Sequence, residues 1–135
     1  MSELETAYRR ARYRVDDGAD AIELRIDTAN AAAAELLRRY GVSGAALVTG
    51  CNPASHLAGA MANDRAQREL EAAVAAADLA WLPGAGLDPD GFWPEEPSLL
   101  VLGIVRCQAA ALARRFGQAA FVWIGTDGVP VLAWT

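Results

Sequence analysis

The chain has 135 residues, which suits one domain, and its 53% hydrophobic content is enough to bury an apolar core. A net charge of −5 disfavours a broad surface for nucleic acid, and the absence of lysine excludes mechanisms that need a lysine amine. The first residues lack a secretory apolar stretch, and no run approaches the roughly 18 apolar residues that span a bilayer. We therefore expect one cytoplasmic domain over residues 1–135, with no nucleic-acid or membrane partner.

Two helices and two strands are predicted in the first part of the chain. Residues 3–15 place apolar side chains at helical spacing, with arginines on the far side. Residues 21–27 alternate apolar and charged side chains, which predicts a strand with one solvated face. Thr28 is suited to cap the next helix at its start, and Gly41 to end it. Residues 45–49 then predict a short buried strand.

The middle of the chain predicts a turn, a helix, a short strand and a long loop. Residues 50–55, GCNPAS, contain a proline and small polar residues and predict a chain reversal. A long helix is expected over 60–77, followed by a short strand at LAWLP. Glycines and prolines are closely spaced from 84 to 97, so we expect an irregular loop there, of the kind that often carries function.

The last part of the chain predicts a central strand, a helix and a hairpin. The apolar run of residues 98–104 is typical of a strand covered on both faces, and residues 105–116 predict a helix that ends at Gly117. Residues 126–128, Thr-Asp-Gly, predict a hairpin whose second strand lies at an edge because it contains Pro130. The expected fold is α+β, in the order α-β-α-β-α-β-β-α-β-β, with a mostly antiparallel five- or six-stranded sheet and about four helices.

Asn63 is the first candidate for a functional side chain. At 100° per residue it points along the same stripe of its helix as Leu70 and Val74. An unpaired buried amide costs about 1–3 kcal/mol, so Asn63 needs a hydrogen-bond partner, and the preceding turn is the nearest in the chain. Both a structural clamp on that turn and a ligand-binding role are compatible with this position.

Glu95 and Glu96 lie between two prolines just before the predicted central strand. One carboxylate is expected to face inward, where it could act as a general acid or base or could hold the loop by accepting backbone N–H bonds. The sequence does not decide which of the two faces inward. The nearby GAG sequence has no helix directly after it, which argues against a phosphate-binding loop.

The histidine and cysteines do not predict a metal site. His56 is the single histidine, and its spacing to Cys51 and Cys107 matches no zinc module. We expect Cys51 to be buried and unreactive. Trp93 differs from the other tryptophans because it falls in the predicted loop, where it is expected beside a pocket.

Four stretches of the chain together carry a family resemblance: AYRRARYRV, VTGCNPASHLAGAMAND, PGAGLDPDGFWPEEPSLLVLGI and ARRFGQAAFVW. They resemble the bacterial family catalogued as domain of unknown function 3293, across almost the whole chain. The resemblance implies motif positions but no reaction, since the family's name states that its function is unassigned. Those positions are Tyr8, Tyr13, Asn52-Pro53-x-Ser55, Asn63, Gly86, Trp93, Glu96 or Glu95, Ser98 and Phe116-Gly117-Gln118.

The candidate residues fall at the ends of expected helices and strands, where side chains from separated segments can meet. Amides, a hydroxyl, a carboxylate and an indole suit a polar small molecule that is held by hydrogen bonds. The expected binding residues are Asn52, Ser55, Asn63, Trp93 and Gln118, and Glu96 is the expected catalytic residue if the protein is an enzyme.

Two functions remain open at this point. The first is a domain that binds a small polar metabolite, nucleotide-like molecules included, with or without a hydrolase or transferase activity that uses no cofactor and no metal. The second is a non-enzymatic interaction or regulatory module, in which the same polar residues lock two loops to the core. The sequence decides neither whether the protein is an enzyme nor its oligomeric state.

Overall fold

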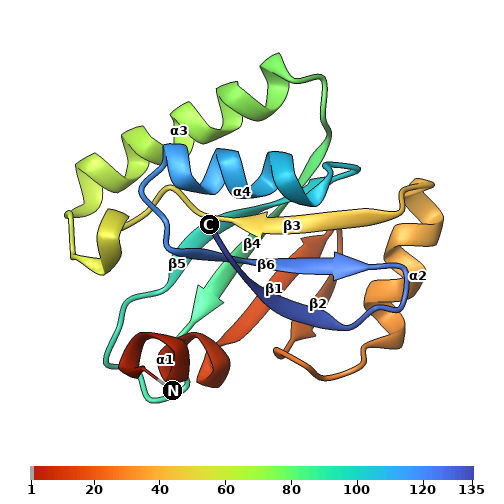
Figure 1. The fold of residues 1–135 in the computed structure, drawn as a ribbon, viewed down its shortest axis with the longest axis horizontal. Helices are drawn as coiled ribbons and strands as arrows, with labels where there is room; N and C mark the ends of the chain where they lie inside the picture. The colour runs from red at the N-terminus through yellow and green to blue at the C-terminus, as the bar shows by residue number, and fades with distance from the viewer. Residues whose placement is uncertain (1) are drawn as a thin grey trace.

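The computed structural model describes residues 2–135, which form a seven-stranded sheet and four α-helices (Figure 1). The helices are α1 (Glu3–Arg10), α2 (Ala31–Tyr40), α3 (Ala60–Ala76) and α4 (Arg106–Arg115). The strands are β1 (Arg12–Asp17), β2 (Asp20–Leu24), β3 (Gly44–Val48), β4 (Trp81–Leu87), β5 (Glu96–Leu102), β6 (Ala120–Gly125) and β7 (Pro130–Trp134). A short 3₁₀ turn, Pro53–Ser55, lies between β3 and α3.

The strands lie in the order β2-β1-β4-β5-β3-β6-β7, and every neighbouring pair is antiparallel. The predicted α+β class and antiparallel sheet are therefore confirmed, whereas the predicted five or six strands were too few. β5 is the central strand and is buried from Ser98 to Leu102, as its continuous apolar run predicted. The hairpin of β6 and β7 and the edge position of β7 are also confirmed.

The additional strand is β1, Arg12–Asp17, which begins within residues 3–15 where a single helix was predicted. The helix ends at Arg10, and Ala11 already has the extended backbone angles φ −60° and ψ 153°. Tyr13 and Val15 are buried while Arg12 and Arg14 are half-buried, which is the two-residue period of a strand. Pairing with β2 and β4 gives these residues a ladder of backbone hydrogen bonds that a continued helix would forgo.

Residues 84–87 also differ from the prediction, because they continue β4 where an irregular loop was expected. Gly84 lies so close to β1 that a Cβ atom would stand 2.7 Å from the carbonyl oxygen of Arg14 and 2.8 Å from Leu47. Gly84 is thus required by strand packing. β5 begins at Glu96, so the irregular segment shortens to residues 88–95.

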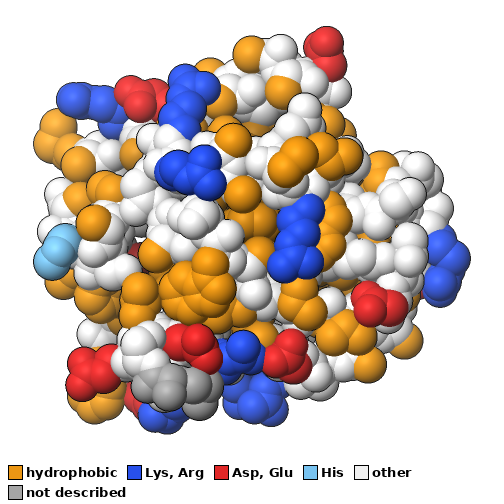
Figure 2. Space-filling model, viewed as in Figure 1, with side chains coloured by type: hydrophobic (Ala, Val, Ile, Leu, Met, Phe, Trp, Pro, Cys, Tyr) orange, Lys and Arg blue, Asp and Glu red, His pale blue; other side chains and the backbone are white. Residues whose placement is uncertain are grey.

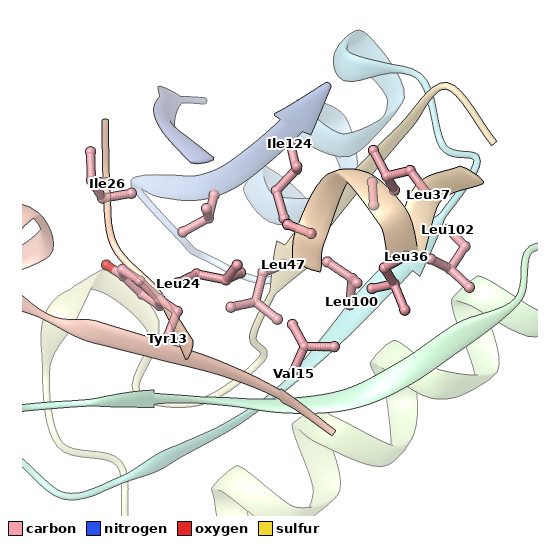
Figure 3. Packing of buried hydrophobic residues seen from close by; sticks show 13 residues of the cluster. Tyr13, Val15, Leu24, Ile26, Leu36, Leu37, Leu47, Leu100, Leu102 and Ile124 are labelled. Atoms are coloured by element: carbon pink, nitrogen blue, oxygen red, sulfur yellow. The ribbon is translucent and has the colours of Figure 1, made fainter. Parts of the chain in front are cut away.

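The sheet is curled and has a different cover on each face. Figure 1 shows α3 and α4 together on one side, where Leu70, Val74 and Ala109 pack on alternate residues of β5 such as Val101. On the other side, Leu36 and Leu37 of α2 pack against a second group of side chains that includes Leu100 and Leu102. Tyr13 and Ile26 lie at one end of this second group, and Leu36, Leu37 and Leu102 lie at the other (Figure 3).

The start of α2 corrects a further expectation. The N-cap is Asn30 rather than Thr28, because the Asn30 side chain accepts a 3.0 Å bond from the Ala33 N–H. Its Nδ2 also donates to the carbonyl of Glu23 at 2.8 Å, which ties the helix to β2. Gly41 ends the helix in the left-handed conformation, with φ 67°, as predicted.

Candidate functional site

A cavity of about 740 Å³ opens between α1, the segment after β4 and the ends of β1 and β5. Its volume falls within the range of roughly 300–1,000 Å³ that is usual for small-molecule sites. Five of the six side chains predicted for the site line it, and they come from three separate segments of the chain: Asn52, Ser55, Trp93, Glu96 and Gln118.

The turn that carries Asn52 and Ser55 has an unusual backbone. Asn52, Ala54 and Ser55 have φ values of 49°, 57° and 60°, in the left-handed region that residues with a side chain seldom adopt. The neighbouring chain holds the turn in place, since the Ala54 N–H donates to the carbonyl of Gly117 at 2.8 Å. Gly117 must be glycine here, because a Cβ atom would lie 2.7 Å from the Pro53 side chain. Strain of this kind is often concentrated at functional sites.

Asn63 fixes the orientation of Asn52. The Asn63 Oδ1 accepts the Asn52 backbone N–H at 2.8 Å, and its Nδ2 donates to the Asn52 Oδ1 at 2.9 Å. The Asn52 Oδ1 also accepts the Ala58 N–H at 3.0 Å. Because two of these donors are backbone N–H groups, both amides have a defined orientation, which directs the Asn52 Nδ2 toward Glu96.

The structure does not bring Asn63 to the first cavity. It lines a second cavity of about 620 Å³ on the other side of Asn52, together with residues from the start of α3. Of the two roles that the sequence left open, this geometry fits the clamp on the preceding turn. Within residues 2–135, both hydrogen bonds of the Asn63 side chain are made with Asn52, which lines the first cavity.

Glu96, and not Glu95, faces the first cavity. The Glu96 Oε2 accepts two hydrogen bonds, from the Asn52 Nδ2 and the Trp93 Nε1, each 2.7 Å long. Glu95 is exposed and lies 3.4 Å from the Arg14 guanidinium on the opposite side of the strand. The carboxylate is therefore held by side-chain donors, whereas the sequence suggested backbone N–H groups as its alternative partners.

Gln118 lies behind the turn and is buried, with 9% of its surface exposed. Its Nε2 donates to two backbone carbonyls, Cys51 at 2.9 Å and Phe116 at 3.3 Å. If the amide were turned over, the Gln118 Oε1 would face two carbonyl oxygens that cannot donate a hydrogen bond. The orientation with the Nε2 toward the carbonyls is therefore favoured.

α1 forms a wall of the cavity without contributing a buried residue to the core. Ion pairs attach it to two loops, with Arg9 2.5 Å from Asp27 and Arg10 2.6 Å from Asp90. Figure 2 shows side chains of both charges next to one another along the lower edge, where Figure 1 places α1. The apolar stripe predicted for this helix lines the cavity with Leu4, Ala7, Tyr8 and Ala11.

Two tyrosines add aromatic surface to this wall. The Tyr13 hydroxyl donates to the backbone carbonyl of Tyr8 at 2.8 Å. Burial raises the pKa of Tyr8; the Ser55 side chain lowers it by a smaller amount, and the charge of Glu96 adds a still smaller increase. The pKa of Tyr13 is also raised, mainly by burial. Both phenols are thus protonated at neutral pH.

Trp93 and Phe92 are positioned by Asp88. The Asp88 carboxylate accepts the backbone N–H groups of Asp90, Phe92 and Trp93 at 2.9–3.0 Å. These bonds lower the pKa of Asp88, so the turn keeps its charged acceptor at neutral pH. Phe92 is 91% exposed at the rim of the cavity. Phe92 was not predicted as a site residue, because no spacing or hydrogen-bonding group in the sequence marks it.

The cysteines lie apart from each other. Cys51 is buried, as expected, and burial raises the pKa of its thiol, whereas Cys107 is exposed on α4. Within residues 2–135, no three His, Cys, Asp or Glu side chains are grouped as a metal site would require.

These features define an α+β domain with a curled antiparallel sheet and a cavity under its first helix. A family model described as protein of unknown function (DUF3293) matches residues 48–121, and the chain belongs to this family. The match includes Asn52, Asn63, Trp93, Glu96 and Gln118 but not α1 or β1. No curated protein and no solved structure matches the chain. No helix within residues 2–135 combines the length and hydropathy that a bilayer crossing needs.

Proposed function

We propose that this protein binds a small polar molecule in the 740 Å³ cavity. The observation that supports the proposal is the convergence of polar side chains from three places on one concave space: the turn after β3, the stretch from Trp93 to the start of β5, and the residues between α4 and β6. A surface connection would not require Asn52, Glu96 and Trp93 to be joined by two 2.7 Å hydrogen bonds. Ligand sites characteristically combine such fixed polar groups with apolar walls.

The cavity is suited to a molecule that has a flat or compact apolar part and a polar end. Tyr8, Tyr13 and Trp93 supply ring surface for the apolar part. Glu96 supplies the fixed polar group, because its Oε2 is held by two donors while its Oε1 accepts no hydrogen bond from residues 2–135. A nucleoside or another heterocyclic metabolite with an N–H or O–H group meets both requirements.

A catalytic version of this proposal assigns proton transfer to Glu96. Its Oε1 is the carboxylate oxygen available to a bound molecule, and Asn52 and Trp93 keep the group in one position. The reaction class is then a hydrolysis or group transfer that relies on acid–base chemistry alone.

The alternative is a non-enzymatic interaction or regulatory module, and one observation favours it. Asn52 is 3% exposed, and both its amide oxygen and its amide nitrogen already have partners within the chain. On this hypothesis the polar cluster only fastens the turn to α3 and β5, and the cavity has no specific ligand.

Thermal-shift measurements with a broad metabolite panel test the proposal on the wild-type protein. A specific ligand at about 100 times its Kd stabilises the folded state by about 2.7 kcal/mol, which gives a clear rise in Tm. Each hit is then titrated calorimetrically against Glu96→Gln, which keeps the shape of the side chain and removes its charge.

Glu95→Gln is the matched control, since it removes one charge from the adjacent residue outside the first cavity. We expect binding to weaken in Glu96→Gln and to remain unchanged in Glu95→Gln. Equal affinities in the two variants would place the ligand elsewhere, and the absence of any hit across the panel would favour the interaction module.

A further inference from the structure

The amide, indole and carboxylate groups of the cavity leave mainly acceptor atoms available. The side-chain nitrogens of Asn52, Trp93 and Gln118 each already donate to an acceptor within the chain, and the guanidinium of Arg10 is held by Asp90. In contrast, neither the Glu96 Oε1 nor the Gln118 Oε1 accepts a hydrogen bond from residues 2–135. A ligand group that contacts these oxygens must therefore donate hydrogen bonds or carry positive charge.

The charged side chains that line the cavity also favour a cationic ligand. Four carboxylates line it, those of Glu3, Asp88, Asp90 and Glu96, against the single guanidinium of Arg10. Arg10 is already paired with Asp90 at 2.6 Å. Among the described residues, no ion pair includes Glu96, although its side chain is half-buried.

The aromatic side chains of the cavity are a third feature that favours a cationic ligand. Tyr8, Tyr13, Phe92 and Trp93 line the same space as Glu96. The face of an aromatic ring carries partial negative charge and attracts ammonium and guanidinium groups, most strongly for tryptophan. A carboxylate without a cationic partner, two free acceptor oxygens and several aromatic rings all favour the same kind of ligand.

We propose that the molecule bound in this cavity carries an organic cation, a substituted ammonium or guanidinium group, that is placed against Glu96. This inference rests on the proposed function and narrows it. Such a group supplies positive charge, and hydrogen-bond donors when it bears N–H, so it satisfies the Glu96 and Gln118 oxygens without requiring a donor from the protein. Phosphorylated nucleotides are disfavoured, because their phosphates would meet the carboxylates of Glu3, Asp88 and Glu96.

Pairs of isosteric probes test the charge requirement directly on the wild-type protein. Choline is compared with its neutral analogue, in which a tert-butyl group replaces the trimethylammonium group, and butylguanidinium is compared with butylurea. Binding is followed by proton–nitrogen NMR of the Trp93 indole N–H, which donates to Glu96. The signal is assigned from its loss in Trp93→Phe. We expect at least one cation to bind about tenfold or more tightly than its neutral partner.

Two variants test whether the preference for the cation depends on Glu96. Glu96→Gln should reduce the preference for the cation to about threefold or less, whereas Glu95→Gln should retain it. Because the isostere comparison needs only the wild type, the result does not depend on how well a variant folds.

The outcomes separate this inference from the proposed function. If the neutral partners shift the Trp93 signal and bind as tightly as the cations, the cation assignment is wrong and the binding cavity stands. If no probe shifts the signal but an uncharged or anionic hit from the metabolite panel does, the cation assignment is wrong as well. If neither probes nor panel hits shift the signal, both proposals fail.

Discussion

Replacing Asn63 by alanine tests whether its bonds to Asn52 hold the wall of the cavity in place. The change removes the acceptor of the 2.8 Å bond from the Asn52 backbone N–H and the donor of the 2.9 Å bond to the Asn52 Oδ1. The Asn52 Oδ1 keeps its bond from Ala58, so the group left without a partner is the backbone N–H. Asn52 is 3% exposed, which leaves that N–H little access to water.

The expected cost follows from this one unsatisfied donor. A buried polar group without a partner costs about 1–3 kcal/mol, so we expect Asn63→Ala to lower the free energy of unfolding by about 2 kcal/mol. With a urea m-value of about 2 kcal/mol/M, the unfolding midpoint should fall by about 1 M. Tryptophan fluorescence during urea titration measures this directly.

Arg65→Ala is the control for this experiment, because Arg65 is an exposed residue on the same helix. Its expected effect is within about 0.5 kcal/mol of zero. If the two variants unfold at the same urea concentration, the Asn52–Asn63 bonds do not stabilise the turn and the clamp argument is refuted.

Three further changes test the fold. Gly84→Ala should destabilise the protein by about 1–3 kcal/mol in urea titrations, because its Cβ would stand 2.7 Å from a neighbouring carbonyl oxygen, whereas Gly86→Ala meets nothing closer than 3.8 Å and should cost clearly less. Asn30→Ala should cost about 1 kcal/mol as the loss of a helix cap, and a larger cost for Thr28→Ala would show that the cap is misassigned. Burial raises the Tyr8 pKa above 10.0, so the stability that the protonated Tyr8 phenol contributes should be present below pH 10.0 and be lost as the pH rises through the raised pKa. Tyr8→Phe should then flatten the decline of the unfolding free energy on alkaline titration. An unchanged slope would contradict the raised pKa.

The elements predicted correctly are those in which the sequence pattern permits one structure. The apolar run of β5 is too short for a buried helix and too continuous for a solvated strand, so it had to be central. β1 is different, because Val15 fits both the helical stripe of residues 3–15 and, with Tyr13, the alternation of a strand. Pairing with β2 and with the distant strand β4 decides between the two, and the helical stripe carries no information about β4.

In the candidate site, too, some features follow from local sequence spacing and others depend on distant parts of the fold. The inward direction of Asn63 followed from helix geometry alone, so it could be predicted together with its need for a partner in the preceding turn. The choice between Glu95 and Glu96 depends on where β5 begins, since successive strand residues face opposite sides. Tyr8 could not be recognised as a cavity residue from spacing, because the apolar side of a helix looks the same whether it covers a core or a cavity.

The strand order also has a consequence for synthesis of the chain on the ribosome. β1 emerges early with β2, but its other neighbour β4 lies far along the chain, since Arg14 pairs with Ala85. At about 5–20 residues per second, the 70 residues between these partners take about 4 to 14 s to synthesise. During that interval the first hairpin has an unpaired edge and an uncovered apolar face that includes Tyr13 and Val15, so the growing chain exposes a strand edge to other chains until β4 is made.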